Sequence, residues 1–106
     1  MIKITYHRGI NRVAIEGHAH YAEEGKDLVC ASATILAYTL SAYVRQKAEE
    51  GACWCDMGHF NKGDCIVSCI ANEGYKERIT EVFDVICKGL EGLAEQFPEF
   101  VSYEIK

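Results

Sequence analysis

The apolar residues between Tyr75 and Phe97 recur at intervals of three and four, which constrains the fold more than any other feature of the sequence. This spacing places apolar side chains along one side of an α-helix and polar side chains along the other. The apolar stripe consists of Ile79, Val82, Phe83, Ile86, Leu90, Leu93 and Phe97. Pro98 follows directly, and proline cannot continue a helix, so an amphipathic helix is predicted to end before it.

A second helix is predicted from about Asp27 to Glu49. Asp27 is a residue type that caps helix N-termini, and the run 28–44 contains no glycine or proline that would break a helix. Several residues in this run are small, namely Ala31, Ser32, Ala33, Ala37 and Ser41. We therefore expect one side of this helix to approach a sheet or another helix closely.

The remaining segments have the patterns of strands. Residues 1–8 alternate apolar and polar side chains, and residues 12–19 are expected to return as the second strand of a hairpin. Residues 52–58 and 63–72 predict another hairpin around His59–Lys62, and residues 100–105 predict a closing strand. The order ββαββαβ predicts an α+β fold in which two helices pack on one face of a mixed sheet. With no repeat or linker, residues 1–106 are expected to form a single domain.

Composition narrows the class of protein. The chain has 106 residues, of which 49% are hydrophobic, and a formal charge of −5, which disfavours a nucleic-acid-binding surface. The N-terminus lacks the apolar segment of a signal peptide, and no stretch approaches the roughly 20 apolar residues of a membrane span. A cytoplasmic protein with no membrane or direct nucleic-acid contact is therefore expected, with its six cysteines as thiols rather than disulfides.

Cys30 and His18 form the most informative pair of side chains. Cys30 is expected near the third position of the helix, where unpaired amides and the helix dipole stabilise a thiolate. His18 lies where the second strand ends, and the loop 19–26 can fold back across the helix start. An imidazole there could take the thiol proton and later protonate a leaving amine. The alternative is that Cys30 is a core thiol, because cysteine is among the most buried residue types.

The segment from Gly17 to Ala31 resembles the ribosomal-processing cysteine proteases, the Prp family of bacteria. Their motif has Gly-His-Ala, a short loop, Gly-Lys-Asp, two apolar residues and Cys-Ala, and here it stands as "GHA", "HYAEE" and "GKDLVCA". The resemblance implies that Cys30 is the nucleophile and His18 the base, with no cofactor. It also implies a homodimer that removes the aromatic-rich N-terminal extension from a ribosomal protein precursor, the twenty-seventh protein of the large subunit.

Four further residues are candidates for supporting roles. Asp27 could cap the helix, which is the preferred interpretation, or orient His18 as a third member of the site. Gly17 and Gly25 could allow close backbone approach or loop motion. Thr34 lies one turn after Cys30, where the resemblance implies a serine, and threonine keeps the hydroxyl. The backbone amides around Cys30 are candidate donors to an oxyanion.

His20 is a second imidazole, two residues beyond His18. In an extended segment the two side chains would point to the same side. We expect His20 to be a solvated loop residue and the polar loop 19–26 to be mobile without substrate. The acidic residues Glu23, Glu24 and Asp27 could attract basic residues of a peptide beyond the scissile bond.

The other cysteines allow a different interpretation. In a hairpin centred on residues 59–62, Cys55 would lie close to Cys65, with Cys53 and Cys69 on the same faces of their strands. Zinc binding is conceivable, but the spacing is unlike that of zinc knuckles, so buried thiols are preferred and no metal site is predicted. The alternatives to a protease are thus a noncatalytic peptide-binding module of ribosome assembly and a small metal-binding or redox protein. Two further expectations are that Cys87 lies in the core and that Trp54 lies on the strand face opposite Cys53 and Cys55.

Overall fold

The structure is a computed structural model that describes residues 1–23, 27–55, 59–61 and 63–106. Its strands and helices, in chain order, are β1 Ile2–His7, β2 Arg12–Glu16, α1 Leu28–Glu49, β3 Cys53–Cys55, β4 His59–Asn61, β5 Asp64–Ala71, α2 Lys76–Gln96 and β6 Val101–Ile105. A short 3-10 turn, Arg8–Ile10, joins β1 to β2.

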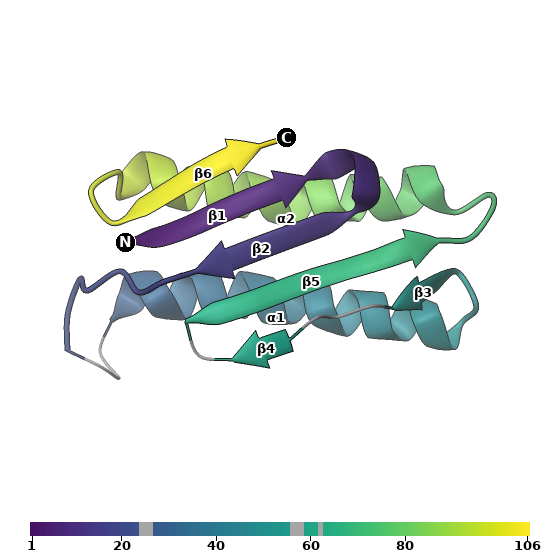
Figure 1. Ribbon diagram of the computed structural model, residues 1–106, viewed down its shortest axis with the longest axis horizontal. Coiled ribbons are helices and arrows are strands. Elements are labelled where there is room, and N and C mark those ends of the chain that lie inside the picture. Colours follow the sequence, from purple (N-terminus) through teal and green to yellow (C-terminus); the bar gives the residue numbers. More distant parts are fainter. Residues whose placement is uncertain (24–26, 56–58, 62) are drawn as a thin grey trace.

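The strands form one mixed sheet with both helices on the same face (Figure 1). The strand order is β3-β5-β2-β1-β6, and β4 also pairs with β5. β1 and β6 are parallel, whereas the other pairs are antiparallel. The predicted α+β fold and its order of elements are therefore confirmed.

The predicted second hairpin differs in detail. Its first arm is divided into two short strands, β3 and β4, which pair with different parts of β5. Cys55 is paired with Cys69 rather than lying close to Cys65, so that expectation was wrong. The physical reason is the position of the turn: His59–Asn61 is itself a strand, and the chain reverses at Gly63, which has a φ of +75°.

Helix α1 is apolar on two sides. One side packs against the sheet through the buried residues Val29, Ala33, Ala37, Leu40 and Val44. The other side leaves large apolar side chains exposed: Leu28 is 70% exposed, and Ile35 and Tyr38 are each 60% exposed.

Because α1 is apolar on two sides, the expectation that no stretch approaches the apolar length of a membrane span is corrected. Helix α1 has the length and the mean hydropathy, 1.3, of a helix that could cross a membrane, although no such stretch was expected. A third of that apolar window is buried within the protein, and core helices of soluble proteins reach the same hydropathy.

Helix α2 buries the apolar stripe that its spacing predicts. Ile79, Phe83 and Leu90 are at most 1% exposed, and the ring of Phe83 stacks on that of Tyr6 in β1. The helix ends at Gln96, before Pro98, as expected. Cys87 is also buried on this side of the helix, which confirms its predicted place in the core.

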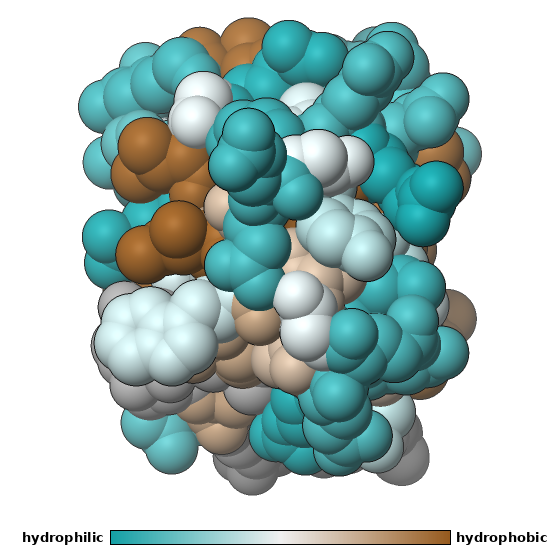
Figure 2. All heavy atoms as spheres, turned by 90° about the vertical axis from the view of Figure 1, so that its right-hand side faces the viewer, coloured by the Kyte–Doolittle hydropathy of each residue, from teal (hydrophilic) through white to brown (hydrophobic). Residues whose placement is uncertain are grey.

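The end of the molecule formed by β3 and the start of α2 is largely hydrophilic (Figure 2). Trp54 is 68% exposed and its cross-strand partner Ile70 is 61% exposed, so both point away from the helices. The side chain of Cys53 is buried on the face of the strand that is turned toward the core. This confirms that Trp54 lies on the opposite face of the strand. The end of β2 and the start of α1, which flank the segment from Gly17 to Ala31, lie at the other end of the molecule (Figure 1).

Candidate active site

A glycine directs the chain out of the sheet directly before His18. β2 ends at Glu16, and Gly17 adopts a φ of +94°, a conformation that residues with a side chain rarely adopt. A Cβ on Gly17 would also collide with the backbone carbonyl of Met1. The N–H of Gly17 donates a hydrogen bond of 2.8 Å to the carbonyl of Gly63 in the β4–β5 turn. Gly17 is therefore required by the local backbone, and it determines where His18 leaves the sheet.

Cys30 is the third residue of α1, as the sequence predicts. Asp27 caps the helix: its Oδ1 accepts the N–H of Val29 and the N–H of Cys30, each at 3.0 Å. The thiol of Cys30 is half-buried, and its sulfur accepts a hydrogen bond of 3.4 Å from the N–H of Ala19. An amide donor and a helix N-terminus both stabilise a thiolate.

The Asp27 carboxylate joins the helix start to the loop that follows His18. Its Oδ2 accepts the N–H of Tyr21 at 3.0 Å. Partial burial alone would raise the pKa of Asp27, but hydrogen bonds from Cys30 and Tyr21 outweigh it and hold this pKa below its usual value. The preferred interpretation of Asp27 as a cap therefore agrees with the geometry, and both of its oxygens are occupied by amides.

The backbone amides around Cys30 also have hydrogen-bond acceptors in this structure. The N–H groups of Val29 and Cys30 donate to the Asp27 carboxylate, and the N–H of Ala31 donates to the Asp27 carbonyl. The expectation that some of these amides serve an oxyanion stays a prediction, and in this structure they donate within the start of the helix. The described amide that lies at the sulfur is instead that of Ala19.

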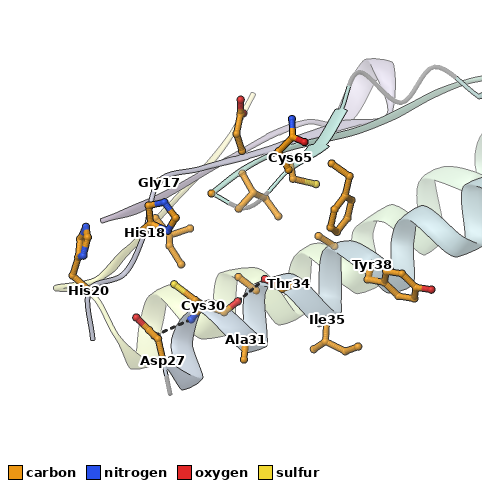
Figure 3. Close-up of a pocket in the computed structure, with 18 of the residues that line it drawn as sticks. Gly17, His18, His20, Asp27, Cys30, Ala31, Thr34, Ile35, Tyr38 and Cys65 are labelled. Carbon is orange, nitrogen blue, oxygen red and sulfur yellow. Dashed lines mark hydrogen bonds between the residues drawn. The ribbon is translucent and has the colours of Figure 1, made fainter. Parts of the chain in front are cut away.

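A cavity of about 950 Å³ connects the strand end to the helix start (Figure 3). His18, His20 and Cys30 line one end of it, and Figure 3 shows the Cys30 sulfur directed from α1 toward the segment that carries His18. From there the cavity follows α1 past Thr34 to Tyr38. The hydroxyl of Thr34 donates to the carbonyl of Cys30 at 2.8 Å, so it holds the first turn of the helix.

Two aromatic side chains form the other end of the cavity. Tyr38 of α1 and Phe60 of β4 meet edge to face, with their ring centroids 6.4 Å apart. Ile35 and Ala31 add apolar surface along the helix between these rings and Cys30. The cavity therefore combines a thiol and imidazoles with an elongated apolar floor, an arrangement suited to holding an extended peptide.

The two histidines are close neighbours, with ring centroids 5.8 Å apart. His20 is exposed and has a φ of +55°, so its expected place as a solvated loop residue is confirmed. The imidazole of His18 is exposed as well, and the sulfur of Cys30 takes its described hydrogen bond from the Ala19 amide rather than from either ring. Catalytic contacts often close only when substrate binds.

The other cysteines lie in different surroundings. Cys53, Cys65, Cys69 and Cys87 are buried. Burial raises the pKa of Cys65 to about 11 and the pKa values of Cys69 and Cys87 to about 12. Among the residues that the structure describes, no three His, Cys, Asp or Glu side chains are grouped so that they could hold a metal ion.

The sequence matches the family described as cysteine protease Prp over residues 1–102. The chain belongs to the cysteine protease Prp family. The family assignment and the fold together establish it as a cysteine protease, and they agree with the resemblance of Gly17–Ala31 to the Prp motif. No curated protein sequence matches the chain.

Solved structures show the same fold. A ribosomal processing protease Prp from Staphylococcus aureus, in complex with a covalently linked product peptide, matches with a TM-score of 0.75 at 19% identity over 99% of this chain and 97% of that one. The same protease with a substrate peptide matches with a TM-score of 0.68 at 18% identity over the same shares. The protein SMU.848 from Streptococcus mutans matches with a TM-score of 0.67 at 28% identity over 98% of this chain and 90% of that one.

Sequence reasoning for a Prp-like site missed three contributors. The Ala19 amide carries no side-chain signal, because any residue would supply it. Phe60 was assigned to a turn, so it was not expected to reach the cavity. Gly63 was considered only as the start of a strand, although its carbonyl binds Gly17. Of the supporting residues, Gly17, Asp27 and Thr34 lie at the cavity, whereas Gly25 falls outside the described residues.

Proposed function

We propose that this protein is a cysteine endopeptidase that removes the N-terminal extension of a ribosomal protein precursor, the twenty-seventh protein of the large subunit. Cys30 is its nucleophile and His18 its general base. The observation that carries the proposal is the cavity in which a thiol at a helix N-terminus and a strand-end imidazole face the same space. The Staphylococcus aureus protease of the same fold holds a substrate peptide and a covalently linked product peptide.

The reaction follows from the chemistry of these groups. His18 takes the proton of the Cys30 thiol, and the sulfur attacks the scissile carbonyl carbon to form a tetrahedral intermediate. His18 then protonates the amine, which leaves as the new N-terminus of the mature protein, and a thioester remains on Cys30. His18 next deprotonates a water molecule that attacks the thioester. The bond between the carbonyl carbon and the sulfur then breaks, the extension leaves as a carboxylic acid, and His18 returns the proton that it took from water to the Cys30 sulfur.

The N–H of Ala19 is placed to stabilise negative charge on the Cys30 sulfur during the reaction. It lies 3.4 Å from the sulfur, so it stabilises the thiolate before attack. Cys30 also lies in the first turn of α1, where the helix dipole favours an anion, and the Asp27 carboxylate that caps this turn offsets part of that effect. Thr34 and Asp27 act indirectly, since the first holds the Cys30 carbonyl and the second holds the Cys30 amide.

The apolar part of the cavity accounts for the proposed selectivity. Tyr38, Phe60 and Ile35 offer rings and a branched side chain to the aromatic residues that precede the scissile bond. The basic residues beyond the bond would meet acidic groups, among them Asp27 and Glu23, while Glu24 lies outside the described residues. Asp64 also lines the cavity and adds to the negative charge.

The same proposal includes a homodimer in the cytoplasm without membrane or direct nucleic-acid contact. Apolar side chains on the outer side of α1 support association, since Leu28 is 70% exposed and lies next to the cavity residue Asp27. The formal charge of −5 supports a basic polypeptide rather than a nucleic acid as the partner.

The test is incubation with the ribosomal protein precursor from the same organism, followed by mass spectrometry of the products. Wild-type protein should release the extension at one bond. Cys30→Ala should abolish cleavage and still bind the precursor, and His18→Ala should lower kcat by about a hundred- to ten-thousand-fold. His20→Ala is the matched control, because its imidazole lies 5.8 Å from that of His18, and it should retain most activity.

Two outcomes would contradict the proposal. Binding of the precursor without cleavage by wild-type protein would favour a noncatalytic peptide-binding module. Full cleavage by His18→Ala together with an inactive, folded His20→Ala would assign the base to the other imidazole.

A further inference from the structure

The β4–β5 turn lies directly against the side chain of His18. Gly63 in this turn lines the same cavity as His18 and adopts a φ of +75°. A Cβ added at Gly63 would lie 2.5 Å from both Cε1 and Nε2 of the His18 imidazole and 3.3 Å from Cδ2. Real Cβ atoms are not found this close to other heavy atoms, so the imidazole occupies space that exists only because residue 63 has no side chain.

The backbone of Gly63 also binds the residue directly before His18. Its carbonyl accepts the N–H of Gly17, the residue directly before His18, at 2.8 Å. The turn therefore contacts the histidine segment twice: once through this hydrogen bond and once through the edge of the ring. The hydrogen bond determines where His18 leaves the sheet, and the missing Cβ determines where its ring can lie.

We infer that Gly63 is a positioning residue for the reaction: it provides the space from which the His18 imidazole faces Cys30. This inference rests on the proposed role of His18. An added side chain at residue 63 would displace the ring rather than the sheet, because the contacted atoms are the far end of an exposed side chain and not backbone. A substitution of Gly63 should therefore reduce catalysis more than it reduces the stability of the fold.

The chain offers a matched control for this inference. Gly51 has a φ of +81°, close to that of Gly63, but a Cβ there would meet no heavy atom within 4 Å. Gly63→Ala and Gly51→Ala thus share the strain of a left-handed backbone. They differ in whether the new methyl group meets the imidazole.

The first experiment compares the two variants in kcat, KM and urea unfolding. Both should lose a similar amount of stability. Gly63→Ala should lower kcat by about 10- to 100-fold with little change in KM, because a misplaced base slows chemistry more than binding. Gly51→Ala should stay within about twofold of wild type. Adding Gly63→Ala to His18→Ala should cause no further loss, because the ring that the methyl group displaces is already absent.

A second experiment does not depend on cleavage. In the wild-type protein, NMR should show a nuclear Overhauser effect between the Hα protons of Gly63 and the Hε1 proton of His18. Gly63→Ala should shift the His18 ring resonances, and Gly51→Ala should leave them in place. If wild-type protein cleaves no precursor but the Overhauser effect is present, the proposed function fails while the position of the ring stands.

Three results would overturn the inference. The first is a Gly63→Ala protein with wild-type kcat. The second is an equal loss of kcat in Gly51→Ala and Gly63→Ala, since backbone strain alone would then explain the loss. The third is a wild-type protein with no contact between Gly63 and the His18 ring.

Discussion

Cys30 differs from the buried cysteines in access and in its neighbours. Its thiol is half-buried, lies in the first turn of α1 and accepts the Ala19 N–H. Cys55 is also half-buried, but it lies in the strand β3 rather than at the start of a helix. A comparison of Cys30 with Cys55 therefore separates the effect of solvent exposure on thiol reactivity from the effect of a position at the start of a helix.

Alkylation with iodoacetamide near neutral pH should modify Cys30 first. Cys55 should react more slowly, because a strand does not stabilise its thiolate. Cys65, Cys69 and Cys87 should stay unmodified while the protein is folded, since burial raises their pKa values to about 11, 12 and 12. Peptide mapping by mass spectrometry measures the order, and faster labelling of Cys55 than of Cys30 would contradict the assigned nucleophile.

Asp27 connects the stability of the helix to pH. Asp27→Ala should lower the free energy of unfolding by about 1 kcal/mol, the usual cost of losing an N-cap, whereas Asp27→Asn should retain most of it. The pKa of Asp27 is lower in the folded protein than in the unfolded chain. Its stabilising effect is thus fully present above the unfolded pKa and is lost as pH falls through the folded pKa.

Urea unfolding at several pH values tests this expectation. Wild-type protein should lose stability below about pH 4, near the unfolded pKa of an aspartate, more steeply than Asp27→Asn. Identical acid profiles for the two proteins would show that the carboxylate charge does not contribute.

At the scale of elements, the loop after β2 is held by an aromatic cluster. The ring of Tyr21 meets the rings of Phe97 and Phe100 edge to face, with centroids 5.5 and 5.3 Å away. Its amide binds Asp27, and the amide of Ala19 binds the Cys30 sulfur. The described part of the loop is thus attached both to the end of α2 and to the start of α1. The expected mobility of the loop 19–26 stays a prediction, and these contacts say which residues would have to separate.

Removing the Tyr21 ring should loosen this attachment. Each edge-to-face contact contributes about 0.5–1.5 kcal/mol, so Tyr21→Ala should speed hydrogen exchange at the amides of Ala19 and Tyr21. It should also lower kcat, because the Ala19 amide would leave the sulfur more often. Tyr75→Ala, a substitution near the start of α2, should change neither measurement. Unaltered exchange in Tyr21→Ala would show that the ring does not hold the loop.

At the scale of the whole molecule, net charge and exposed apolar surface determine what the protein can bind. The formal charge is −5, and Asp27 and Asp64 line the cavity itself. A basic peptide would therefore be attracted both at long range and at the site.

Salt should weaken the binding of a basic precursor. The Debye length falls from about 10 Å at 0.1 M salt to about 3 Å at 1 M, so KM should rise with ionic strength while kcat changes little. A precursor peptide in which the basic residues are replaced by glutamine should have a higher KM and a weaker dependence on salt. A KM that is independent of salt for both peptides would refute the electrostatic contribution.

Association should cover part of the exposed apolar surface. Leu28, Ile35 and Tyr38 on the outer side of α1 are 70%, 60% and 60% exposed, and exposed apolar side chains on one side of a helix are a candidate surface for association. Sedimentation equilibrium should therefore show a dimer at high micromolar concentration, and Leu28→Lys should shift it toward monomer if this side of α1 is the contact. A wild-type monomer under these conditions would contradict the proposed homodimer.

The order of elements could be predicted from the sequence because short-range periodicity determines it. The three- and four-residue spacing before Pro98 predicted α2, and alternation predicted β1 and β2. Asp27 as a cap and Cys30 in the first helical turn also depend only on neighbours a few residues away. The motif from Gly17 to Ala31 was sufficient to indicate the family for the same reason.

Tertiary structure decided the features that join segments far apart in the chain. Cys55 pairs with Cys69 and does not lie close to Cys65. This pairing depends on where the turn before β5 closes. The contact of Gly63 with His18 joins residues that no local pattern connects. Glycine in a turn has the same sequence signal whether its missing Cβ faces solvent or an imidazole. Only the packing of the β4–β5 turn against the end of β2 distinguishes Gly63 from Gly51, because steric contact depends on distance in space and not on separation along the chain.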